Sequence, residues 1–115
     1  METYNVDLNT LVNSNVDLIS GRAFGEKEAE KFHIMDHVNN NEKIVIYIDD
    51  QKVKAINDSF IKGFFSDVFK ILKTKERVQQ IFEVEGNDYF IRLFHKNWTI
   101  LEALYGSSTN PSAIS

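Results

Sequence analysis

The chain has 115 residues, of which 43% are hydrophobic and 26% are charged, and this composition excludes a wholly disordered protein. Thirteen basic residues against 17 acidic ones leave a net charge of -4, so bulk electrostatics do not favour nucleic acid as a partner. The absence of cysteine excludes disulfides, thiolate metal sites and a thiol nucleophile.

The first third of the chain predicts an edge strand followed by a helix. Residues 4–8 alternate between apolar and polar side chains, as in a strand with one buried face. Short apolar stretches at 11–12 and 16–19 predict one or two further short strands. The apolar spacing over 24–38 predicts a helix, whose early acidic residues suit the positive end of the helix dipole.

The clearest strand signal lies in residues 43–50. Five consecutive apolar or aromatic residues, 44–48, are bounded by charge on both sides. A run without alternation predicts a strand that is buried on both faces, in the centre of a sheet covered by helices.

Residues 59–72 predict a helix with an unusually wide apolar face. Two neighbouring rows of apolar side chains, one through Phe60 and the other through Ile61, repeat at helical spacing. Asn57 or Asp58 is a suitable N-terminal cap, because a short side-chain oxygen accepts from the first free N–H groups. The aromatic excess of this helix indicates either a filled core or a homo-oligomer interface, and the pattern does not separate the two.

The last part of the chain predicts a strand, a helix and a tail. Residues 78–85 indicate a more exposed strand, and 88–104 a third helix. The small and polar residues around Pro111 predict that 106–115 form a flexible tail beyond a single domain at 1–105. The fold class expected from this order is α/β, a small sandwich with a mixed sheet of about four strands and roughly three packed helices.

Three stretches of the chain resemble a known family. They are residues 21–25, the strand ending at Asp49, and residues 56–65, in which Asp58, Ser59 and Phe60 open a helix. Together they resemble the bacterial STAS-like domain family of unknown function, which is distantly similar to the anti-sigma-factor antagonists. The resemblance implies a STAS-like fold, a GHKL-type ATPase or serine kinase as partner, and Ser59 as the phosphoacceptor.

The candidate interaction surface surrounds this helix start and the preceding loop. An Asp-Ser pair at a helix start is also the commonest kind of cap, and two aspartates after a strand are also an ordinary charged strand end. Open α/β sheets nevertheless bind ligands at the carboxyl ends of their strands, so both pairs stay candidates. The residues of the predicted surface are Asp49, Asp50, Asn57, Asp58, Ser59 and Lys62.

Two other groups of residues have weaker signals. His33 and His37 have the i, i+4 spacing that lets two imidazoles reach one metal, but a solvated helix face with no metal is the favoured interpretation. The single tryptophan, Trp98, is surrounded in sequence by polar residues, which leaves either an interface role or partial core burial.

The function expected from the sequence is a non-enzymatic regulatory or protein-interaction module without catalytic residues or cofactors. The chain start has no signal-peptide pattern, and no apolar run approaches the ~18 residues of a membrane helix, so a cytoplasmic protein without membrane contact is expected. Two alternatives stay open. One is a small nucleotide- or metal-binding enzyme domain centred on Asp49, Asp50 and Ser59. The other is a structural subunit of an obligate complex.

Overall fold

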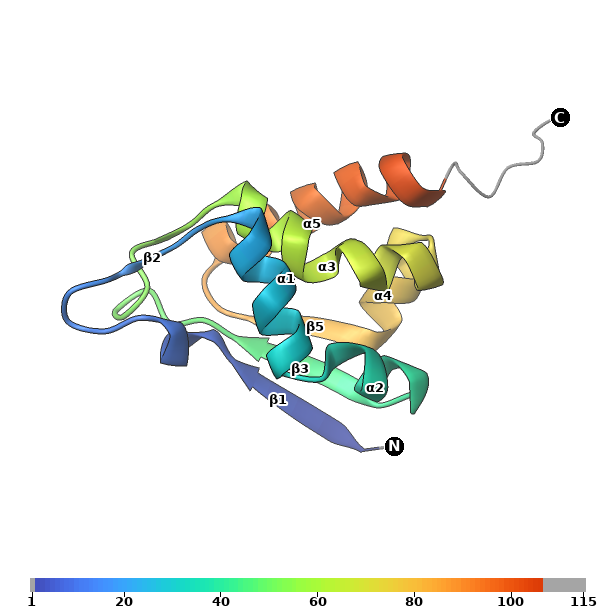
Figure 1. The fold of residues 1–115 in the computed structure, drawn as a ribbon, viewed down its shortest axis with the longest axis horizontal. Coiled ribbons are helices and arrows are strands. Elements are labelled where there is room, and N and C mark those ends of the chain that lie inside the picture. Colours follow the sequence, from blue (N-terminus) through green and yellow to red (C-terminus); the bar gives the residue numbers. More distant parts are fainter. Residues whose placement is uncertain (1, 107–115) are drawn as a thin grey trace, which may run out of the picture.

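A three-stranded parallel sheet with all its helices on one face organises the chain in the computed structural model, which describes residues 2–106 (Figure 1). The strands β1 (Thr3–Asp7), β3 (Lys43–Tyr47) and β5 (Phe82–Glu85) lie in the order β1-β3-β5. Both neighbouring pairs are parallel. A second, two-stranded parallel sheet joins β2 (Leu18–Ile19) to β4 (Ala55–Ile56).

Helices make up most of the described structure. A 3-10 turn follows β1, and a π-helical turn, Glu102–Gly106, follows the last helix. The expected α/β class is confirmed, but the expected mixed sheet of four strands with three helices is wrong. The five helices of residues 2–106 are α1 (Arg22–Lys31), α2 (Ile34–Asn39), α3 (Asp58–Leu72), α4 (Lys75–Ile81) and α5 (Asp88–Leu101).

Two local features explain the additional helices. The helix expected over 24–38 is divided at His33, which has a φ of 56° and so leaves the right-handed helical region. Residues 78–81 belong to α4 rather than to a strand, because Thr74 begins a helix there. Its Oγ1 accepts a hydrogen bond from the Arg77 N–H at 3.2 Å.

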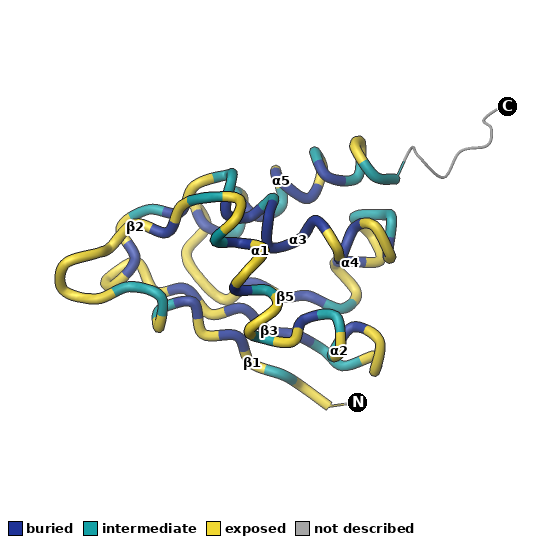
Figure 2. Tube along the Cα trace, in the orientation of Figure 1, coloured by how far each residue is buried: buried dark blue, intermediate teal, exposed yellow. Residues whose placement is uncertain are grey.

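The two faces of the parallel sheet have different surroundings (Figure 2). The register puts Val6, Ile46 and Val84 in one row of the face that packs against the helices, and all three are buried. On the opposite face Tyr47 is 40% exposed. The expectation that residues 43–50 form a strand buried on both faces is confirmed at Val45, which is 8% exposed on this second face, but is wrong at Tyr47, because within residues 2–106 no helix covers that face.

Helix α3 forms the centre of the core. Both of its apolar rows are buried within this single chain, so its aromatic residues fill the core. Phe65 packs edge-on against Phe82, Phe94 and Trp98, with ring centroids 5.0, 6.1 and 5.3 Å away. Trp98 is only 1% exposed and belongs fully to the core.

Helices α1 and α3 touch through their backbones at two glycines. A Cβ on Gly25 would lie 2.2 Å from the Phe60 carbonyl oxygen, and one on Gly63 would lie 2.1 Å from the Arg22 carbonyl oxygen. No real Cβ tolerates such distances, and the obstructing atoms are backbone atoms that cannot rotate away. Glycine at both positions is therefore required for this close approach.

The residues 107–115 of the predicted tail lie outside the described residues. Across 2–106, none of the helices has both the length and the apolar character needed to cross a membrane.

We predict that Gly25→Ala and Gly63→Ala each lower the free energy of unfolding by about 3 kcal/mol, because the added methyl forces the two helices apart. Urea denaturation followed by Trp98 fluorescence measures this loss. Lys27→Ala, an exposed position on α1, is the control and should leave the free energy unchanged. Equal stability of the glycine variants and the control would contradict the backbone contact.

Candidate functional site

The starts of α1 and α3 meet at the hydroxyl of Ser59. Ser59 is half-buried in the first turn of α3, and its Oγ accepts a hydrogen bond from the Gly21 N–H at 3.2 Å. Gly21 is the residue that precedes α1. The positive ends of two helix dipoles therefore converge on one serine hydroxyl.

The small sheet of β2 and β4 holds the chain just before both helix starts. Ile19 and Ile56 are paired in register, and the Asn57 N–H donates to the Ile19 carbonyl oxygen at 2.8 Å. Asn57 occupies the N-cap position of α3, as expected. Its side chain, however, does not cap the helix, and its Nδ2 donates to Ser20 Oγ at 2.9 Å instead.

Asp58, the first residue of α3, is bound by two residues of α5. Lys96 Nζ donates to one carboxylate oxygen at 3.2 Å, and Asn97 Nδ2 donates to the other at 3.1 Å. The hydrogen bond from the fully buried Asn97, together with the charge of Lys96, lowers the pKa of Asp58 below its usual value of 3.8. The sequence pattern does not reveal this cluster, because the partners lie almost forty residues apart.

A shallow hollow of about 440 Å³ lies beside Ser59, between the start of α3 and α5. Tyr89 of α5 lines it and is 57% exposed. Lys62 lies one turn along α3, and its positive charge also lowers the pKa of Asp58. The predicted residues Asn57, Asp58, Ser59 and Lys62 are thus brought together, with Tyr89 and Lys96 as additions that only the structure revealed.

Asp49 and Asp50 line a different hollow, of about 380 Å³, at the carboxyl ends of the three parallel strands. The Asp49 N–H donates to Asn9 Oδ1 at 2.8 Å, and Asp50 accepts from Asn87 Nδ2 at 3.1 Å. Asn9, Asp49 and Asn87 follow β1, β3 and β5 respectively. Among the described residues none lines both hollows, so the surface predicted as one consists of two.

The two histidines of the i, i+4 pair do not converge. His33 lies between α1 and α2, and its Nδ1 is 3.8 Å from Asp36. His37 Nδ1 lies 2.7 Å from Glu42, and its ring stacks on Tyr4 with centroids 3.6 Å apart. Residues 2–106 contain no group of three or more histidine and acidic side chains placed to hold a metal.

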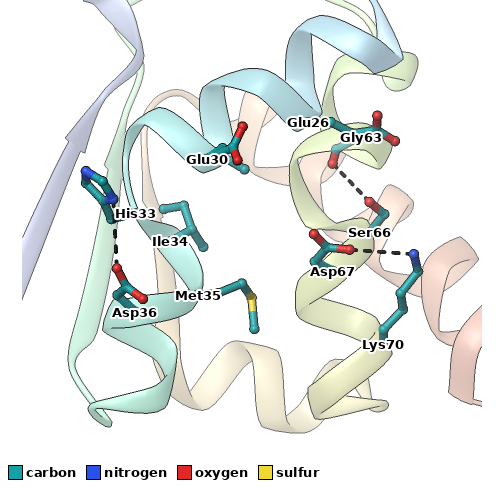
Figure 3. A pocket seen from close by; sticks show the side chains of 11 residues that line it. Glu26, Glu30, His33, Ile34, Met35, Asp36, Gly63, Ser66, Asp67 and Lys70 are labelled. Carbon is teal, nitrogen blue, oxygen red and sulfur yellow. Dashed lines mark hydrogen bonds and ion pairs between the residues drawn. The ribbon is translucent and has the colours of Figure 1, made fainter.

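A further hollow, of about 520 Å³, is lined by residues of α1, α2 and α3 (Figure 3). Ile34 and Met35 point into it, and several of its polar groups are paired with one another. Ser66 Oγ donates to the Gly63 carbonyl oxygen at 3.1 Å, and Lys70 Nζ lies 3.5 Å from Asp67. The sequence pattern does not reveal this hollow, since its walls come from separate helices.

Comparison with known proteins adds no identification: no family model, no curated protein and no solved structure matches this chain.

We predict that Asp58→Ala lowers the free energy of unfolding at pH 7 by about 1–2 kcal/mol, because Lys96 and Asn97 lose a charged acceptor. Since the pKa of Asp58 is lowered by folding, its contribution is present above pH 3.8 and is lost as the pH falls through the folded-state pKa. The difference between wild type and variant should therefore shrink in acid.

Urea denaturation at pH 7 and at pH 3 checks this prediction. Asp67→Ala, which removes an exposed carboxylate from the same helix, is the matched control and should cost no more than about 0.5 kcal/mol. An Asp58→Ala effect as small as that of the control would show that the cluster contributes nothing to stability.

Proposed function

We propose that this chain is a non-enzymatic regulatory module that docks onto a protein partner around the start of α3, and that phosphorylation of Ser59 switches this docking. The observation that carries the proposal is the Gly21 N–H···Ser59 Oγ hydrogen bond, which brings two helix starts to one hydroxyl. By the STAS-like resemblance, the partner is a GHKL-type ATPase or serine kinase.

A phosphate on Ser59 would suit its surroundings electrostatically. It would add a charge of about -1.5 to -2 beside the Gly21 N–H, where the starts of α1 and α3 meet. Asp58 next to it is already paired with Lys96 and Asn97, which limits repulsion between the carboxylate and the phosphate. The same added charge would convert a surface of mixed sign into an acidic one, and a partner that fits the first would be repelled by the second.

The hollow beside Ser59 provides the apolar part of the docking surface. Tyr89 and Leu93 line it together with the polar residues of the start of α3. An exposed tyrosine surrounded by polar groups is a frequent anchor in protein interfaces, because it buries a large rigid ring and retains one polar group. Tyr89 is therefore the residue expected to contribute most to partner binding.

The alternative of a small enzyme domain is less well supported. A catalytic centre made from Asp49, Asp50 and Ser59 requires the three side chains to face one cavity. The two aspartates line the hollow at the strand ends, whereas Ser59 lines the hollow beside α5.

The switch is tested by purifying the tagged chain from its native cells and mapping its modifications by mass spectrometry. We expect co-purification of a GHKL-type ATPase and a fraction of the chain that carries one phosphate at Ser59. Ser59→Glu should weaken binding of that ATPase at least about tenfold, as a mimic of the added charge, whereas Ser59→Ala should retain it. Tyr89→Ala should also weaken binding.

Ser14→Glu, which places the same charge on an exposed loop, is the matched control and should bind as wild type does. Thermal unfolding of each variant shows that it is folded. The switch would be contradicted if Ser14→Glu weakened partner binding as much as Ser59→Glu does. It would also be contradicted if Ser59→Glu bound the partner as tightly as wild type does. Wild-type binding by Tyr89→Ala would contradict the proposed docking surface.

A further inference from the structure

The second face of the β1-β3-β5 sheet is open in residues 2–106. Parallel sheets in globular proteins almost always have both faces covered, so a bare face on a purely parallel sheet indicates an interaction surface. Its outward residues, given by the strand register, are Thr3, Asn5 and Asp7 of β1, Lys43, Val45 and Tyr47 of β3, and Glu83 and Glu85 of β5. Val45 at the centre of the face is only 8% exposed, whereas the other outward residues are half-buried or exposed.

The carboxyl-terminal row of this face combines an aromatic ring with two carboxylates. Tyr47 is paired in register with Asp7 on one side and with Glu85 on the other. A cation placed over the tyrosine ring gains from the ring quadrupole and from both flanking charges. The single basic residue of the face, Lys43, lies two rows away from these and is 3.5 Å from Glu83.

The face continues into the hollow at the strand ends. Tyr47 and Glu85 line that hollow of about 380 Å³ together with Asp49 and Asp50. Its lining therefore has three acidic residues and no basic one among the described residues. A concave surface with charge of one sign concentrates its field and attracts the opposite charge.

The acidic side chains of β5 crowd one another. Glu83 and Glu85 project from the same face of the strand, and hydrogen bonding and repulsion from Glu83 raise the pKa of Glu85 above its ordinary 4.5. A bound cation would relieve this repulsion.

The size and charge of the face decide what kind of partner fits. Strands of five residues in three rows span only about 200 Å², against about 800 Å² per partner in a stable interface between two folded proteins. A second copy of the chain would place one acidic face against another. A short extended segment that carries positive side chains satisfies both constraints.

We propose that the open sheet face and the adjoining hollow at the strand ends dock a short arginine- or lysine-rich segment of another protein. Tyr47 stacks on a cationic side chain, and Asp49, Asp50 and Glu85 bind the charged groups. This surface is separate from the start of α3, and the proposal does not depend on the Ser59 switch.

The test is an NMR titration of the isotope-labelled chain with a short peptide of alternating arginine and serine. We expect amide shifts confined to residues 3–9, 43–50 and 82–87, and a dissociation constant that Tyr47→Ala and Glu85→Gln each raise about tenfold. The same peptide with glutamine in place of arginine should not bind. Ser59→Glu should bind the arginine peptide as wild type does.

Glu30→Gln, on α1 and outside this surface, removes the same charge as Glu85→Gln and is the matched control. If Glu30→Gln weakens binding as much as Glu85→Gln, the peptide senses only net charge and the proposal is wrong. Amide shifts at the hollow lined by α1, α2 and α3, or no amide shifts at millimolar peptide, would also overturn the proposal. Unchanged thermal unfolding of the Tyr47 and Glu85 variants confirms that their effects are local.

Discussion

The backbone contact of α1 with α3 through Gly25 and Gly63 is the constraint on which the rest of the structure depends. Because no side chain separates the two helices at these points, their starts lie close enough for the Gly21 N–H to reach Ser59. The same contact holds α3 in the centre of the molecule, where both of its apolar rows are covered. Core packing and the proposed phosphorylation site thus have one geometric origin.

Helices on only one side of the sheet have an equally direct consequence. Side chains alternate along a strand, so every second residue of β1, β3 and β5 faces away from the core. Those positions carry charged or polar side chains around Val45 and Tyr47. The chain therefore keeps a small, mostly acidic sheet face available while its core is complete on the other side.

The two polar surfaces differ in how their charges are balanced. At the start of α3 the carboxylate of Asp58 has both a lysine and a buried amide as partners, and Lys62 adds further positive charge. At the strand ends, Asp50 accepts hydrogen bonds from two neutral amides, those of Gln51 and Asn87, and the neighbouring Glu83 raises the pKa of Glu85. These differences underlie the two proposals, phosphorylation at the first surface and docking of a positively charged segment at the second.

Local pattern by itself determined the elements whose signal is strong: the repeated apolar rows of α3, the alternation in β1 and the apolar run of β3 are visible without any partner. The break at His33 and the helix at 75–81 depend on single backbone and cap geometries that the periodicity does not report. An apolar run has the same sequence pattern whether one face or both faces of the strand are covered, so only the tertiary structure revealed the exposure of Tyr47.

The site residues Asp58 and Ser59 could likewise be selected from their residue types, but their partners Lys96, Asn97 and Gly21 come from distant segments. Those contacts follow from helix packing, which is decided by the shape of the whole core rather than by any local spacing.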